Sequence, residues 1–226
     1  VVFYPYFEVE CELLLTVKEG FLRRTTKERV MRISVLADAV VGDIVTYSKA
    51  SGFTPVMPLL KSLELSRDEL EALRVLAENE SMTVPALASR LSWSGAKARK
   101  ALQGLASRGV VKMAKAGRQI YYTFKKPRLE ALSPLSPQVT LSEGEPKTGI
   151  LVKPQLDQAD IKESLEALWD LKAEDQRLIY YPYYIAKVSE KGGEEIKVID
   201  LVRGAELKGT LQRIFTQMVF ADMVML

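Results

Sequence analysis

The sequence predicts an α+β protein in which a central helical unit lies between two similar β-rich units, with further helices near the C-terminus. Three observations lead to this prediction. Apolar residues recur at helical spacing before a hairpin pattern, both ends of the chain carry the same aromatic motif, and a stretch rich in proline, serine and glycine separates the halves. The predicted units are a first β-hairpin with its connector (1–60), the helical unit (61–127), a linker (128–157), and a last unit of helix, second β-hairpin and C-terminal helix (158–226).

The composition is that of an ordinary globular protein, with 47% hydrophobic and 27% charged residues among 226. No apolar run approaches the roughly 18 residues that span a bilayer, and no secretory leader is recognisable, so we expect no membrane association. Cys11 is the only cysteine, which excludes an intramolecular disulfide and favours a cytoplasmic location.

The residue types needed for several kinds of chemistry are missing. The chain has no histidine, and with a single cysteine this excludes zinc fingers and histidine-dependent catalytic triads. The phosphate-binding loop GxxxxGK[ST] is absent, and no clustered Asp/Glu motif suggests a carboxylate metal site. We therefore expect a protein that is not an enzyme and that holds neither a metal nor another cofactor.

The basic residues are unevenly distributed. No acidic residue occurs between Glu80 and Glu130, although the whole chain has 32 basic and 29 acidic residues. Eleven of the 32 lie in this stretch, which leaves 21 basic against 29 acidic residues elsewhere. Such asymmetry is typical of a protein that binds a polyanion, most often nucleic acid. The eleven are Arg90, Lys97, Arg99, Lys100, Arg108, Lys112, Lys115, Arg118, Lys125, Lys126 and Arg128.

Two helices are predicted at the start of the helical unit. Ser66 and Glu69 have the pattern of a capping box, in which each side chain binds the other residue's backbone N–H. The second helix is expected after Thr83, with Pro85 in its first turn, where the missing N–H costs little.

A third helix is predicted up to Gly109, which suits the left-handed position after a helix end. Lys97, Lys100 and Gln103 project away from its apolar face, and Arg99 lies near the boundary. That face is formed at i, i+3, i+4 and i+7 by Ala98, Ala101, Leu102 and Leu105.

Two β-prone runs follow the third helix, at residues 110–113 and 120–124. Gly117 lies in the connection between them and permits a positive φ there, so we expect a hairpin. Its tip would present Lys115 and Arg118 to phosphates or to a minor groove.

Residues 83–88 (TVPALA) through 109–111 (GVV), with the closing hairpin, resemble the winged helix-turn-helix family, especially its prokaryotic and archaeal regulators. The resemblance covers about residues 64–126. It implies that the third helix reads the major groove of duplex DNA and that the hairpin, the wing, contacts the backbone. Winged helices also serve as protein-docking modules, and an acidic partner could use the same cations. The residues expected at DNA are Lys97, Arg99, Lys100, Gln103, Lys112, Lys115, Arg118, Lys125 and Lys126.

An aromatic motif occurs twice, as FYPYF at residues 3–7 and as YYPYY at residues 180–184. Each copy is followed by strand patterns and then by an aspartate with a glycine four residues later, first at Asp38 and then at Asp200. This order predicts an internal duplication whose hairpins pair as one β platform around the helical unit. We expect the aromatic residues in the sheet core, with stacking on bases as the alternative. The aspartates are expected to form turns, with a catalytic pair as the alternative.

Helices are also predicted near residues 158–171 and 207–223, on either side of the second hairpin. Proline within each aromatic motif favours a sheet edge or a strand start. The stretch from residue 127 to 154 is expected to be an extended linker.

The function predicted first is a cytoplasmic, DNA-binding transcriptional regulator that binds double-stranded DNA and forms a homodimer or a larger assembly. The aromatic repeats with their aspartate-containing tails also resemble segments that accompany archaeal HerA/FtsK-like ATPases. That resemblance implies a non-catalytic accessory region of a nucleic-acid-translocating assembly. A winged-helix scaffold that binds protein is the other alternative.

Overall fold

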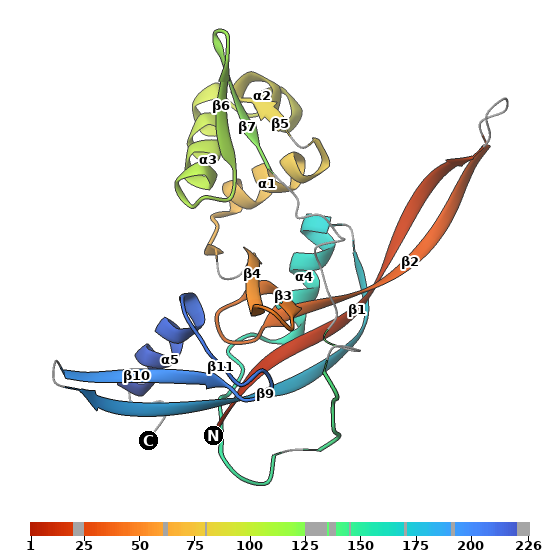
Figure 1. Cartoon of the computed structure of the whole chain (residues 1–226). Coiled ribbons are helices and arrows are strands. Elements are labelled where there is room, and N and C mark those ends of the chain that lie inside the picture. The colour runs from red at the N-terminus through yellow and green to blue at the C-terminus, as the bar shows by residue number, and fades with distance from the viewer. Residues whose placement is uncertain are drawn as a thin grey trace.

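The computed structural model describes residues 1–19, 25–60, 63–79, 81–124, 135, 139–144, 146–169, 171–190 and 193–220. Over these residues the protein is mixed α and β, with five helices, a large curled sheet and a small three-stranded sheet (Figure 1). The predicted α+β class is therefore confirmed.

The large sheet has eight strands in the order β11-β10-β9-β1-β2-β3-β4, with β8 pairing β1 outside this path. Two long antiparallel hairpins, β1–β2 and β9–β10, extend from its centre in opposite directions (Figure 1). The strands are β1 (Val2–Glu19), β2 (Thr25–Asp38), β3 (Asp43–Ser48), β4 (Gly52–Pro58), β8 (Ile150–Leu151), β9 (Lys172–Glu190), β10 (Gly193–Asp200) and β11 (Ala205–Glu206).

The two aromatic motifs pair directly with each other. Strands β1 and β9 are antiparallel, and Tyr4 is opposite Tyr181, which occupies the same position in the second motif. Pairing within the β1–β2 hairpin begins at Tyr6, one residue after Pro5. Pairing within the β9–β10 hairpin likewise begins at Tyr183, one residue after Pro182. A proline has no N–H to donate, so these are positions where its presence interrupts no hairpin hydrogen bond. Pro5 lies near the start of β1, as expected, but the expectation is wrong for Pro182, which lies in the middle of β9, between β10 and β1.

Asp38 and Asp200 make matching interactions. Asp38 Oδ1 accepts from the Tyr4 hydroxyl at 2.9 Å, and Asp200 Oδ1 accepts from the Tyr181 hydroxyl at 2.8 Å. Each Oδ1 also accepts from the backbone N–H groups two and three residues later, at 2.9 to 3.0 Å. Both carboxylates thus form turns, as the sequence predicts, and they anchor these turns to β1 and β9, respectively.

Four tyrosines of the two motifs lie in a core on one face of the sheet. Tyr6 stacks on Phe53 with 3.8 Å between ring centroids, and its hydroxyl lies 3.1 Å from that of Tyr183. Helix α5 (Thr210–Phe220) covers this face through Phe215, which contacts the rings of Tyr4 and Tyr183. The tyrosines at positions 4, 6, 181 and 183 are at most 1% exposed, so the core interpretation is confirmed for these four rings and base stacking by them is excluded. Tyr184 of the second motif differs, because it is 45% exposed.

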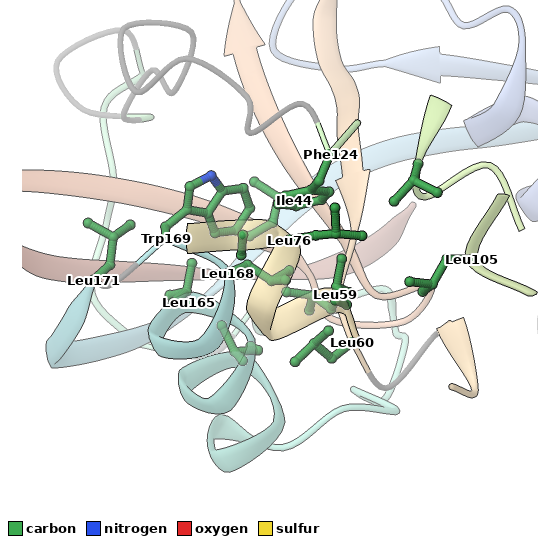
Figure 2. Close-up of a cluster of buried hydrophobic side chains, with 14 of the residues drawn as sticks. Ile44, Leu59, Leu60, Leu76, Leu105, Phe124, Leu165, Leu168, Trp169 and Leu171 are labelled. Carbon is green, nitrogen blue, oxygen red and sulfur yellow. The ribbon is translucent and has the colours of Figure 1, made fainter. Parts of the chain in front are cut away.

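A second core joins the helical unit to the opposite face of the sheet. Helix α4 (Gln158–Trp169) contributes Leu165, Leu168 and Trp169, which lie beside Leu76 of the helical unit (Figure 2). Ile44, Leu59, Leu60, Leu105 and Phe124 belong to the same buried cluster. The helical unit is therefore packed on the sheet.

The last part of the predicted extended linker, from Ile150 to Leu156, is hydrogen-bonded to the large sheet and its turn. Ile150 N–H donates to the Val1 carbonyl at 2.9 Å, and Val152 N–H donates to the Phe3 carbonyl at 3.0 Å. Gln155 and Leu156 both donate to the Ala39 carbonyl. These residues lie along the sheet because the start of β1 extends beyond β2 and has free backbone groups on that side. The sequence patterns do not predict strands β3, β4, β8 and β11.

Candidate nucleic-acid interface

The helical unit consists of three helices and a small sheet. The helices are α1 (Arg67–Asn79), α2 (Val84–Leu91) and α3 (Gly95–Ser107), and the strands β5 (Ser81–Thr83), β6 (Lys112–Ala116) and β7 (Gln119–Thr123) pair in the order β5-β7-β6. Strands β6 and β7 form a hairpin that projects beyond the helices (Figure 1). Leu73, Leu76, Leu87, Leu102 and Leu105 are fully buried between the helices.

Local sequence signals set the boundaries of these elements. Ser66 N–H donates to Glu69 Oε2 at 2.8 Å, and Glu69 N–H donates to Ser66 Oγ at 3.3 Å, so the predicted capping box is confirmed. Thr83 caps α2 by accepting from Ala86 N–H. Gly109 and Gly117 have φ of 74° and 62°, which favours glycine after α3 and at the two-residue hairpin tip.

Helix α3 buries the predicted apolar face and exposes the opposite one. Lys100 and Gln103 are exposed and lie about half a turn from the buried face. Lys97 lies toward α1, where its Nζ is 2.9 Å from Asp68 Oδ1 and 4.2 Å from the centroid of the Trp93 ring. The buried residues of the helix are Ala98, Ala101, Leu102 and Leu105.

Glu69 of α1 lies against Gly104 of α3 and pairs with Arg108 at the end of that helix. Its side chain is 10% exposed, and its Oε1 lies 3.6 Å from Arg108 Nε. Burial works toward a higher pKa for Glu69, but the hydrogen bonds from Ser66 and the charge of Arg108 outweigh it and lower the pKa. A Cβ at Gly104 would lie 1.9 Å from Glu69 Oε1, so only glycine leaves room for this side chain.

Packing against α1 divides the cations of the acid-free stretch into two groups. Arg90, Lys97 and Arg108 pair with Glu78, Asp68 and Glu69 of α1. Among the described residues the other cations of the stretch make no ion pair and are exposed on α3 and the hairpin. These five, the unpaired cations, are Arg99, Lys100, Lys112, Lys115 and Arg118.

A notch of about 450 Å³ lies between α3, the start of α2 and the hairpin. Arg99 and Gln103 line it from α3, and Arg118 lines it from the hairpin tip. The notch brings residues that are 19 positions apart in the sequence to one concave surface. Its other lining residues are Thr83, Val84, Pro85, Gln119, Ile120 and Tyr122.

Residues 60–128 match a family model described as sugar-specific transcriptional regulator TrmB. This segment is a winged helix-turn-helix domain. The segment covers about a third of the chain, and the remainder, which contains the large sheet, lies outside the match.

Two solved structures resemble part of the chain. The antimony-specific transcriptional repressor AntR is 28% identical over 27% of this chain and 55% of its own, with a TM-score of 0.24. The chain thus matches about half the length of that repressor. The DNA-binding domain of the repressor BlaI is 22% identical over 32% of this chain and 94% of its own, with a TM-score of 0.26. No curated protein matched.

The winged helix places the predicted DNA-binding residues in three settings. Arg99, Gln103 and Arg118 meet at the notch, while Lys97 is held in its ion pair with Asp68. Lys100, Lys112 and Lys115 are exposed outside the notch, and Lys125 and Lys126 lie outside the described residues. The sequence alone does not indicate Ile120 as part of this site, because its alternation with Tyr122 is typical of an ordinary strand.

Within the part of the chain that the structure describes, no group of three or more Asp, Glu, Cys or His side chains could hold a metal ion. No helix there is both long enough and apolar enough to cross a membrane.

Proposed function

We propose that this protein is a transcriptional regulator that binds duplex DNA through α3 and the wing. The observation that carries the proposal is the set of five unpaired cations exposed on these two elements, of which Arg99 and Arg118 line one notch. The family model that matches residues 60–128 describes transcriptional regulators, which supports the same function.

The charge distribution on the winged helix favours a polyanion over a generic solvated surface. Asp68, Glu69 and Glu78 lie on α1 and pair with the cations beside them. Because these three carboxylates pair with the cations that lie beside α1, they do not neutralise the five unpaired cations, and the surface of α3 and the wing keeps a positive charge. Binding to phosphates would release the counterions that this surface attracts in the free protein.

Fluorescence anisotropy with a random duplex between about 50 and 300 mM salt tests the proposal. If the five unpaired cations each meet a phosphate, log K against log salt should have a slope of roughly −4 to −5. Lys100→Gln and Arg118→Gln should each make that slope about one unit less steep. No binding to duplex at the lowest salt would refute the proposal.

Arg90→Gln is the matched control. Arg90 carries the same charge and belongs to the same acid-free stretch, but its guanidinium pairs with Glu78 at 3.3 Å. The slope of this variant should therefore equal that of the unmodified protein. An equal loss of slope in all three variants would show that net charge, and not the α3 and wing surface, sets the affinity.

Homodimerisation is part of the proposal, because two winged helices related by symmetry would bind two half-sites. Support comes from β9, where Leu178 and Tyr184 are 40% and 45% exposed on the same side of the strand. Light scattering at micromolar protein should give twice the chain mass, and Tyr184→Ser should reduce it. A regulator of this kind would act in the cytoplasm, with the DNA that it binds.

We also propose that the two hairpin units are copies of one duplicated segment. The matching turns at Asp38 and Asp200 support this proposal. An accessory role beside a nucleic-acid-translocating ATPase and a protein-binding scaffold remain alternative hypotheses. Absence of duplex binding would favour the scaffold.

A further inference from the structure

Two large apolar side chains are exposed on the wing. Met113 on β6 is 60% exposed and Ile120 on β7 is 48% exposed. Met113 is opposite Tyr122 and Lys115 is opposite Ile120, so all four side chains lie on one face of the hairpin. Tyr122 is buried against the helices, whereas Ile120 and Met113 continue that apolar face into solvent. The exposed pair is thus an extension of the core along the wing.

Ile120 forms an apolar wall of the notch. Val84 and Pro85, at the start of α2, also line it. The cationic side chains of Arg99 and Arg118 line the same notch from α3 and from the wing tip. Among the described residues neither guanidinium has an acidic partner, so both are free to bind an anion.

An apolar wall beside two unpaired guanidinium groups matches a nucleic-acid backbone, in which apolar sugar rings alternate with phosphates. An acidic peptide would satisfy the guanidinium groups but would place carboxylates where the notch is apolar, at the cost of their hydration. The combination therefore favours a strand of DNA over an acidic protein segment.

We propose that the notch binds one backbone strand of duplex DNA, with Ile120, and Met113 beyond it, against deoxyribose rings and with Arg99 and Arg118 at the phosphates. This inference rests on the proposed function and adds a contact that does not depend on salt. Phosphate contacts release counterions, whereas an apolar contact with a sugar releases none. The two contributions can be separated by measuring affinity as a function of salt.

The test compares Ile120→Thr with the unmodified protein on a random duplex over the same salt range. Threonine keeps the branched Cβ that suits the strand and removes apolar surface. Burial of about half an isoleucine side chain corresponds to roughly fivefold in affinity, so Ile120→Thr should bind about fivefold more weakly at every salt concentration. Its salt slope should be unchanged, and Ile120→Val should retain most of the affinity.

Val30→Thr is the matched control, because Val30 is a branched residue on β2 that is 58% exposed and far along the chain from the wing. It should bind DNA like the unmodified protein. If Ile120→Thr matches Val30→Thr while the unmodified protein binds duplex with a steep slope, the sugar contact is refuted and the proposed function stands. If the unmodified protein binds no duplex, both fail, and binding of an acidic peptide would then identify the notch as a protein-docking site.

Discussion

Replacement of Gly104 by alanine tests how α1 holds the recognition helix. In an exposed helix this change should stabilise the protein by about 1 kcal/mol, because alanine is the better helix former. At Gly104, however, the new Cβ would lie 1.9 Å from Glu69 Oε1 and 2.9 Å from Glu69 Cδ. The Glu69 carboxylate would have to move, and the same rigid group accepts from Ser66 N–H and pairs with Arg108.

The expected cost follows from these two interactions. Loss of the capping hydrogen bond costs about 0.5 to 2 kcal/mol, and loss of a partly exposed ion pair costs about 0 to 1 kcal/mol. Set against the helix-propensity gain, Gly104→Ala should destabilise the protein by roughly 1 kcal/mol. Gly95→Ala, in the first turn of the same helix, meets no atom within 4 Å and should stabilise it by up to about 1 kcal/mol.

Urea unfolding followed by circular dichroism measures both changes in unfolding free energy. The decisive comparison is Gly104→Ala in a Glu69→Ala background, where the collision is absent and alanine should become stabilising. If Gly104→Ala stabilises the unmodified protein as much as Gly95→Ala does, Glu69 does not fill the space over Gly104 and the reasoning is wrong.

Three further outcomes are expected. Lys97→Gln should weaken duplex binding less than Lys100→Gln, because the Lys97 ammonium already pairs with a carboxylate of α1; equal losses in anisotropy would contradict this. Burial raises the pKa of Asp38 to about 6 from its ordinary 3.8, so the folded state binds the proton more tightly and stability should increase as pH falls from 7.5 to 5, by about 1.4 kcal/mol. Thermal unfolding of Asp38→Asn should show a weaker pH dependence. Tyr181→Phe removes the hydroxyl that donates to buried Asp200 at 2.8 Å and should cost about 1 to 3 kcal/mol, which urea unfolding would measure.

Short-range signals in the sequence predict much of the winged helix. The capping box at Ser66 and Glu69, the cap at Thr83 and the glycines after α3 and in the wing act on neighbouring backbone groups, so their effect can be read without the fold. The duplicated aromatic motif likewise predicts that two hairpins pair in one sheet. Strand β8 escapes prediction because it has only two residues and its partner β1 is distant in the sequence. Strands β3 and β4 pair with neighbouring segments, but they have only six and seven residues and lack a clear alternation of apolar and polar residues.

The sequence by itself determines that positive charge is concentrated between Glu80 and Glu130, in a segment whose patterns predict helices closed by a hairpin. Only the tertiary structure decides which charges remain available. Arg90, Lys97 and Arg108 are neutralised by α1, whereas Arg99 and Arg118 meet at a notch with an apolar wall. Ion pairing depends on separations of a few ångströms, and these are set by how the helices pack and not by position along the chain.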